Sequence, residues 1–395
     1  MQSFRSILFL ATLFGVLNLL GVQPGQAQEL ATQEGFVNAR VGGKLVRFET
    51  FVARLKDLPA GQTRLPIALI AHGKPPTDGR MTDMRARAYG PAARDFALRG
   101  YLAVVVMRRG FGRSDGPSPV AVSCGEKTFG ERFEADADDM EAALAVVSQR
   151  PDADPDNVVA IGVSAGGAAI VTLAARNPKG LRAVVNVSGG LRIEGCAKDN
   201  LLVSPITDAG GRAKAKSVWI YAENDSFFPP AIVDKMHEGY LEKGGDVRRV
   251  RVPAMGTDGH SMFGTLNGRR IWLSEADTLL RDVGLPTWSQ ANVRGLLHAL
   301  KLTDKQSSFI ERYLSSPAEK AMAKSVTSER TFFQFGAGDM AEARDRAMRT
   351  CETREPKEKC EIVVENYELT QPTGERRILA LKPAPQAQQP AKPGN

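Results

Sequence analysis

Short apolar runs rich in Val and Ile recur between residues 67 and 255, and longer segments with a helical period separate them. The runs are "IALIAHG", "YLAVVVM", "NVVAIGVS", "LRAVVNVSGG", "SVWIYAEND" and "DVRRVRVPAM". Continuous Val/Ile/Leu runs are typical of strands buried on both faces, and strands that alternate with helices pair in parallel. The sequence therefore predicts an α/β fold, with a mostly parallel sheet flanked by helices, over residues 28–300.

The helical segments between these runs include "MTDMRARAYGPAARDFAL", "FEADADDMEAALAVVSQR", "AGGAAIVTLAARN" and "PPAIVDKMHEGYLEKG". Ahead of them, alternating apolar and polar residues in "FVNARVGGKLVRFETFVARL" flank two glycines, Gly42 and Gly43. That pattern predicts a leading antiparallel hairpin.

The pattern changes near residue 301. "RTFFQFGAG", "MAEARDRAMRTCETR" and "KCEIVVENYEL" predict a strand, a helix and a strand, hence a small C-terminal α+β unit over residues 301–381. The tail 382–395 is rich in Pro, Gln and Ala, and we expect it to be disordered.

The N-terminus has the pattern of a secretory signal over residues 1–27. One Arg precedes an apolar run from Ile7 to Val22, and Gly25-Gln26-Ala27 has the small-x-small pattern of a cleavage site. An uncleaved membrane anchor is the alternative. No later segment is apolar enough to cross a bilayer, so we expect a periplasmic or extracellular protein without stable membrane insertion after cleavage.

Four cysteines follow the signal. Cys351 and Cys360 are close in sequence, which leaves Cys124 to pair with Cys196. In an oxidising compartment two disulfides are the expected state. No histidine lies near either pair in sequence, so we do not expect a metal site. The formal charge of +7 is spread along 395 residues without an aromatic-basic stripe, so we expect no nucleic-acid binding.

The residues Gly162-Val163-Ser164-Ala165-Gly166 fit the G-x-S-x-G turn that exposes a nucleophilic serine between a strand and a helix. A glycine-rich packing turn is the alternative. In "VVVMRRGFGRSDG" the third glycine comes one place too late for a dinucleotide-binding loop, and no helical pattern opens there.

A nucleophilic serine needs a base, and the chain has four histidines. His72 precedes the serine, while His237 and His298 lie within helical patterns. His260 lies in a glycine-rich loop after the last predicted parallel strand, and this order and position make it the candidate base.

The base needs an orienting carboxylate. Asp225 is the candidate because "VWIYAEND" is a strand that ends directly in a loop, where catalytic groups of parallel sheets gather. Glu223, in the same loop, and Asp258, near His260, are the alternatives.

An oxyanion hole needs two backbone N–H groups. We expect one from Ala165, directly after the nucleophile. We expect the other from Lys74 in the loop after "IALIAHG", with Gly73 as the alternative, since Pro75 has no N–H. His72 is then a structural residue of this loop.

Together the motifs "HGKPP", "RGYLAVVVMRRGFGRSDG", "GVSAGG", "AENDSFF" and "GTDGHSMFG" resemble the dienelactone-hydrolase-like branch of the α/β-hydrolase fold, across residues 35–285. The resemblance implies the same nucleophile, acid and base as the argument from the residues. Dienelactone hydrolases proper use a cysteine nucleophile, so the serine points towards a general esterase or acyl hydrolase. The resemblance does not cover the C-terminal unit. It places Cys124 and Cys196 in loops beside the active-site edge, where their bridge would shape the entrance.

We therefore expect a secreted serine hydrolase that cleaves small-molecule carboxylic esters through an acyl-enzyme, without a metal or organic cofactor. "SFFPP" and "SMFG" suggest an apolar wall for the substrate. A peptidase of the prolyl-oligopeptidase type is the alternative within the same chemistry, although the chain has no propeller-sized N-terminal domain. A non-catalytic exported binding protein on a hydrolase fold is the alternative from another class.

Overall fold

The computed structural model describes residues 30–56, 58, 62–75, 78–118, 120, 123–124, 128–193, 196, 199–287, 296–316, 319–365, 368–370 and 376–378. The expected signal segment 1–27 and the tail 382–395 lie outside the described residues. Among the helices that are described, none combines the length and the apolar character needed to span a membrane.

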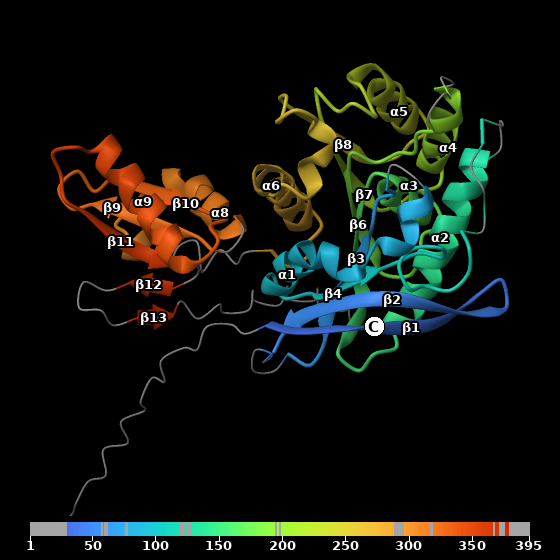
Figure 1. Ribbon diagram of the computed structural model, residues 1–395, viewed down its shortest axis with the longest axis horizontal. Coiled ribbons are helices and arrows are strands. Elements are labelled where there is room, and N and C mark those ends of the chain that lie inside the picture. The colour runs from blue at the N-terminus through green and yellow to red at the C-terminus, as the bar shows by residue number, and fades with distance from the viewer. Residues whose placement is uncertain are drawn as a thin grey trace, which may run out of the picture.

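Eight strands form the main sheet, in the order β1-β2-β4-β3-β5-β6-β7-β8 (Figure 1). The strands from β4 to β8 in this order run parallel, and β2 pairs antiparallel with both β4 and β1. Every residue of β3 and β4 is buried, as expected for strands with helices on both faces. The bounds are β1 Leu30–Val41, β2 Lys44–Leu55, β3 Leu65–Ala71, β4 Leu102–Val106, β5 Ala153–Val163, β6 Leu181–Val187, β7 Lys216–Ala222 and β8 Val247–Val252.

Helices cover both faces of this sheet (Figure 1). One face packs against α1 (Gly90–Leu98) and α6 (Leu266–Asp282). The other face packs against α2 to α5, whose bounds are α2 Thr128–Val147, α3 Ala165–Ala174, α4 Asn200–Gly210 and α5 Pro230–Glu242. The α/β fold class predicted from the sequence is confirmed, and so is the leading hairpin, in which Val41 pairs with Lys44.

One predicted helix is wrong in its first half. The segment "MTDMRARAYGPAARDFAL" contains the end of the 3-10 helix η1 (Asp78–Asp83), the separate 3-10 helix η2 (Ala86–Tyr89) and then α1. A proline lacks the N–H of a helical hydrogen bond and disfavours helical backbone before it, so Pro91 is tolerated only in the first turn of a helix. The α-helix accordingly begins at Gly90.

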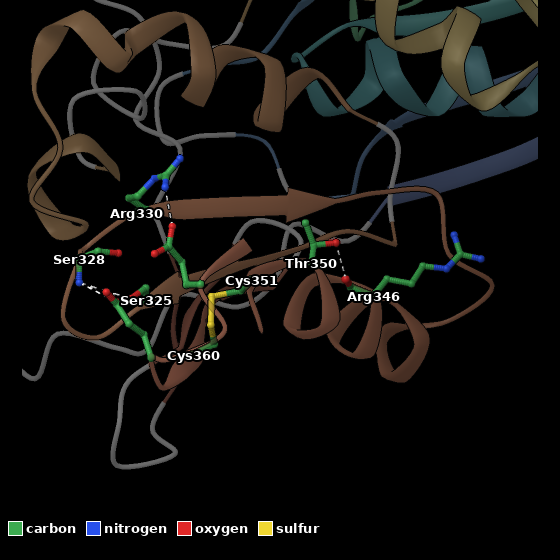
Figure 2. Close-up of a disulfide and its surroundings, with 9 residues drawn as sticks. Ser325, Ser328, Arg330, Arg346, Thr350, Cys351 and Cys360 are labelled. Carbon is green, nitrogen blue, oxygen red and sulfur yellow. Dashed lines mark hydrogen bonds and ion pairs between the residues drawn. A yellow bond between two sulfur atoms is a disulfide. The ribbon is translucent and has the colours of Figure 1, made fainter. Parts of the chain in front are cut away.

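The C-terminal unit is a second, antiparallel sheet in the order β10-β9-β11-β12-β13. Helix α9 packs its alanines on one face, and the Cys351–Cys360 bridge joins α9 to the first residue of β11 (Figure 2). The bounds are η4 Asp304–Gln306, α8 Ser307–Ser315, β9 Ala321–Ser325, β10 Thr331–Gln334, α9 Met340–Arg354, β11 Cys360–Glu365, β12 Glu368–Thr370 and β13 Arg376–Ile378.

This small sheet lies beside α1 and α6 of the main domain (Figure 1). Leu98, at the end of α1, packs into the apolar cluster of the C-terminal unit. The Arg270 guanidinium of α6 lies 5.7 Å from the ring of Phe333 and 5.5 Å from that of Phe335. The unit therefore contacts the helical layer of the main sheet through apolar and cation–π contacts.

Candidate active site

Ser164 occupies a sharp turn between β5 and α3. Its backbone has φ 52° and ψ −126°, a conformation that residues other than glycine rarely adopt. Two hydrogen bonds fix the turn: the Ser164 N–H donates to the Val187 carbonyl at 3.2 Å, and the Gly190 N–H donates to the Ser164 carbonyl at 2.9 Å. Strain of this kind persists only where neighbouring structure over-determines it, and it gathers at functional sites.

Gly162 and Gly166 permit this turn. A Cβ on Gly162 would lie 2.3 Å from the Gly166 carbonyl oxygen, and one on Gly166 would lie 2.4 Å from the Ala71 carbonyl oxygen. No real Cβ atom tolerates such contacts, so both positions require glycine. The spacing of the motif thus follows from the close approach of α3 to the ends of β3 and β5.

The structure brings three predicted side chains together at the carboxyl edge of the sheet. The Nε2 atom of His260 lies 3.2 Å from Ser164 Oγ, and its Nδ1 atom lies 3.0 and 3.2 Å from the two carboxylate oxygens of Asp225. An ionised carboxylate only accepts hydrogen bonds, so Nδ1 carries the proton and Nε2 is left to accept from the serine hydroxyl. This is the arrangement that makes a serine nucleophilic.

Asp225 is held rigidly in the loop after β7. Its side chain is fully buried, and Oδ1 accepts the backbone N–H groups of Phe227 and Phe228, both at 3.0 Å. These bonds leave the carboxylate one orientation, with its edge towards His260. The ring of Phe227 lies 4.4 Å from the His260 ring and that of Phe228 lies 5.4 Å from it, so both phenylalanines shield the imidazole.

The two alternative carboxylates occupy other positions. Glu223 is exposed and lines a separate cavity of about 120 Å³ beside α5. Asp258 accepts the backbone N–H of His260 at 2.9 Å, whereas the His260 ring contacts Asp225. Burial acts to raise the pKa of Asp258, but hydrogen bonds from Ser226 and His260 outweigh it and lower the pKa below its ordinary value.

Of the two residues predicted to supply oxyanion donors, Ala165 directly follows the nucleophile, and Lys74 lines the same cavity as Ser164. Ala165 is the first residue of α3, and the first N–H groups of a helix have no partner within it. The loop after β3 passes so close that a Cβ on Gly73 would lie 3.3 Å from Ser164 Cβ. The Gly73 N–H donates to Tyr89 Oη at 3.2 Å.

His72 has a structural role in this loop. It is fully buried, its Nδ1 lies 2.6 Å from the Gly73 carbonyl, and its Nε2 accepts the Arg108 N–H at 3.0 Å. Burial, and then the nearby Arg108 charge, lower the pKa of His72 well below its ordinary value, so the imidazole is neutral. It holds the strand end in place and does not contact Ser164 in the described bonds.

A cavity of about 410 Å³ opens directly onto Ser164 and His260. Its apolar wall comes from η2, α1 and η3 (Gly259–Phe263), and its described polar lining contains cationic side chains but no Asp or Glu. The apolar lining residues are Met84, Ala88, Tyr89, Pro91, Ala92, Val163 and Phe263, and the cations are Lys74, Arg85 and Arg269.

Of the expected wall, "SMFG" supplies Phe263, while the phenylalanines of "SFFPP" pack against His260 instead. The sequence does not predict that η2 and α1 line the cavity, because nothing local in "RARAYGPAA" is typical of a pocket wall. Only the fold brings this segment beside Ser164. Burial raises the pKa of Tyr89 above its ordinary value, so its hydroxyl stays protonated.

Cys124 and Cys196 are bonded, in the predicted pairing. Cys124 lies in the loop between β4 and α2, and Cys196 lies in the loop between β6 and α4. Since β3 and β5 lie between β4 and β6 in the sheet, the bridge joins loops on either side of the strands that flank the nucleophile turn.

Comparison with known proteins supports the same architecture. The model of the family "X-Pro dipeptidyl-peptidase (S15 family)" matches residues 53–210, which run from β2 through the nucleophile turn to the end of α4. Combined with the parallel order of β4, β3, β5, β6, β7 and β8, this match is decisive for the fold. The chain has the α/β-hydrolase fold. The predicted α/β-hydrolase fold is thereby confirmed. A search of curated protein sequences finds no match.

The solved structures that are similar to this chain include three proteins at 14–17% identity. An acylaminoacyl peptidase of Pyrococcus horikoshii matches 66% of this chain and 43% of its own, at a TM-score of 0.47. An esterase of Pyrococcus furiosus matches 63% of this chain and 90% of its own, at a TM-score of 0.44. A dienelactone hydrolase-like promiscuous phosphotriesterase from metagenomic libraries matches 56% of this chain and 82% of its own, at a TM-score of 0.42. Likeness at this level concerns the fold and leaves the substrate open.

Proposed function

We propose that this α/β hydrolase is a serine hydrolase that cleaves carboxylic esters through an acyl-enzyme. The observation that supports the proposal is the unbroken hydrogen-bonded chain from Ser164 through His260 to Asp225, beside a cavity large enough for a small ester. A purely structural role would not require Ser164 to have a positive φ. It would also not require its hydroxyl to face Nε2 of His260, the ring nitrogen that can accept the proton.

The reaction then has two halves. His260 Nε2 takes the Ser164 proton as Oγ attacks the ester carbonyl, and the tetrahedral oxyanion is stabilised by the N–H groups of Ala165 and Lys74. The same imidazolium returns the proton to the departing alcohol as the carbon–oxygen bond breaks. His260 then deprotonates a water molecule, which attacks the acyl carbonyl and forms a second tetrahedral intermediate. As this intermediate collapses, the bond from carbon to Ser164 Oγ breaks, His260 returns the proton to Oγ, and the carboxylic acid leaves.

The lining of the cavity favours esters over N-terminal dipeptides. A dipeptidyl-peptidase releases its dipeptide from a chain that begins with a charged α-ammonium, and a buried ammonium needs a carboxylate partner. The described lining offers Lys74, Arg85 and Arg269 and no carboxylate. Peptide cleavage is the second candidate, and the family match over residues 53–210 is the observation in its favour.

The test compares both substrate types on one preparation. We expect p-nitrophenyl acetate, butyrate and octanoate to be hydrolysed, with Ser164→Ala inactive, and alanyl-prolyl-p-nitroanilide to be cleaved at least 100-fold more slowly in kcat/KM. Faster cleavage of the anilide would assign the peptidase activity instead. Inactivity towards both, in protein with both disulfides formed, would contradict the hydrolase proposal.

We also propose that the protein is exported. Two disulfides among the described residues suit an oxidising compartment. N-terminal sequencing of the mature protein from the periplasm or medium is expected to begin at Gln28, while a start at Met1 in the membrane fraction would favour the anchor.

A further inference from the structure

The contact between base and acid depends on two separate loops. Asp225 follows β7 and His260 follows β8, and each loop projects from the end of its strand. The neighbouring strands fix where each loop begins. They do not fix the side chains that lie three to eight residues beyond the strand ends. A 3.0 Å bond from His260 Nδ1 to Asp225 therefore needs direct bonds between the loops.

Asp258 makes such bonds. Its Oδ1 accepts the Ser226 N–H at 3.1 Å and the His260 N–H at 2.9 Å, while its Oδ2 accepts the Ser226 hydroxyl at 2.7 Å. One carboxylate thus joins the residue directly after the acid to the backbone of the base itself. Hydrogen bonds to an ionised carboxylate are stronger than bonds between neutral groups.

Asn224 makes a second set of bonds on the other side of the acid. Its Oδ1 accepts the Met255 N–H at 2.8 Å, its Nδ2 donates to the Met255 carbonyl at 3.2 Å, and its carbonyl accepts the Gly259 N–H at 3.2 Å. The residues on both sides of Asp225 are therefore bonded to the loop that bears His260.

We propose that Asp258 is a positioning residue that holds the loop of the acid against the loop of the base, so that the imidazole meets Asp225. The proposal rests on the proposed serine hydrolase for its kinetic consequences. Asp258 does not compete with Asp225 as the orienting acid, since its oxygens accept backbone N–H groups and a hydroxyl while the ring nitrogen bonds to Asp225.

This role predicts a specific kinetic defect. Asp258 is absent from the described lining of the cavity, so its loss leaves substrate binding unchanged. Misplacing a catalytic group by about 1 Å costs up to about 100-fold in rate. Asp258→Ala is therefore expected to lower kcat about 10- to 100-fold while KM stays within twofold of the wild type. Because Asp258 is partly exposed, the variant should fold.

The experiment is a double-mutant cycle with a substrate-independent readout. Asp258→Ala, Ser226→Ala and the double variant are compared by kcat and KM on the best p-nitrophenyl ester and by the rate constant of labelling with a fluorophosphonate. Ser226→Ala removes one of the three bonds, so a smaller defect is expected. Because both variants break the same contact, the double variant should be no slower than Asp258→Ala. Asp282→Ala, which removes an exposed aspartate at the end of α6, is the matched control and should equal the wild type.

A proton NMR measurement separates this proposal from the proposed function. The Nδ1 proton of His260, bonded to Asp225, is expected to give a low-field resonance in the wild type that broadens or disappears in Asp258→Ala. If the wild type is neither labelled by the fluorophosphonate nor active on the esters, the hydrolase proposal is wrong. The His260 resonance would still test the role of Asp258. Full activity in Asp258→Ala, a defect confined to KM, additive losses in the cycle, or an unchanged resonance would each overturn the inference.

Discussion

His260 Nε2 lies 3.2 Å from Ser164 Oγ, although 96 residues separate the two in sequence. The contact exists because β5 and β8 run parallel in one sheet, so the loops after them emerge at the same edge. On the other side of the imidazole, Nδ1 meets a fully buried carboxylate that already accepts two backbone N–H groups. The base therefore has one orientation and one tautomer.

Replacing the acid should invert that tautomer. In Asp225→Asn the amide can donate to Nδ1, which would place the ring proton on Nε2, facing Ser164, and block proton abstraction. We expect kcat to fall about 10,000-fold. The control is Glu223→Gln, an exposed carboxyl group in the same loop, which should keep wild-type kcat. Comparable losses in the two variants would show that Asp225 has no special role.

The nucleophile turn should tolerate no side chain at Gly166. A Cβ there would lie 2.4 Å from the carbonyl oxygens of both Ala71 and His72, so the Ala substitution must displace backbone in α3 or β3. We expect Gly166→Ala to lower the free energy of unfolding by about 3 kcal/mol or more, measured by urea denaturation. At Gly35 an added Cβ would meet no atom within 4 Å, so Gly35→Ala should be neutral or slightly stabilising. Equal stability of the two variants would contradict this account of the motif.

Asp139 should make stability depend on pH. Burial, opposed by its bonds to Arg109, raises the pKa of Asp139 from 3.8 to about 6. The folded state then keeps this proton up to about pH 6, while the unfolded chain releases it near pH 4, so rising pH favours unfolding across this window. Relative to Asp139→Asn, the wild type should lose about 2 kcal/mol of unfolding free energy between pH 4 and pH 7. A flat or rising difference would contradict the raised pKa.

The Cys351–Cys360 bridge should stabilise only the C-terminal unit. It closes a short loop, with a sequence separation of 9, between α9 and β11 (Figure 2). Removing it with Cys351→Ala and Cys360→Ala should raise amide exchange in α9 as its unfolding free energy falls by about 2–3 kcal/mol. Labelling of Ser164 should keep its wild-type rate. Loss of labelling would mean that the unit supports the active site directly.

The parallel sheet and the positions of Ser164, Asp225 and His260 were predictable because each rests on local sequence. Buried strands read as continuous Val/Ile runs, and a loop residue directly after such a run must lie at the carboxyl edge. The sequence does not predict strand β9, "AMAKS", because Lys324 and the preceding Lys320 break its apolar pattern. Both lysines are buried, and Lys320 Nζ donates to the carbonyls of Leu314 and Ser316 at the end of α8. Only tertiary structure supplies those partners.

The wall of the cavity and the role of Asp258 were not predictable in the same way. Tyr89 and Arg85 lie more than 70 residues before Ser164, in a segment whose period resembles a single helix. Asp258 could be singled out as a carboxylate near the base, but its bonds to Ser226 depend on how two loops meet. Contacts between loops leave no periodic signal in a sequence.

The most direct test of the active site is covalent labelling of the native, oxidised protein with a fluorophosphonate, followed by mass spectrometry of its peptides. We expect a single adduct on Ser164 at neutral pH, and no adduct in His260→Ala, because the hydroxyl is reactive only when the imidazole accepts its proton. An unlabelled wild type, or an adduct that forms equally well without His260, would contradict the assembly of these residues into a catalytic site.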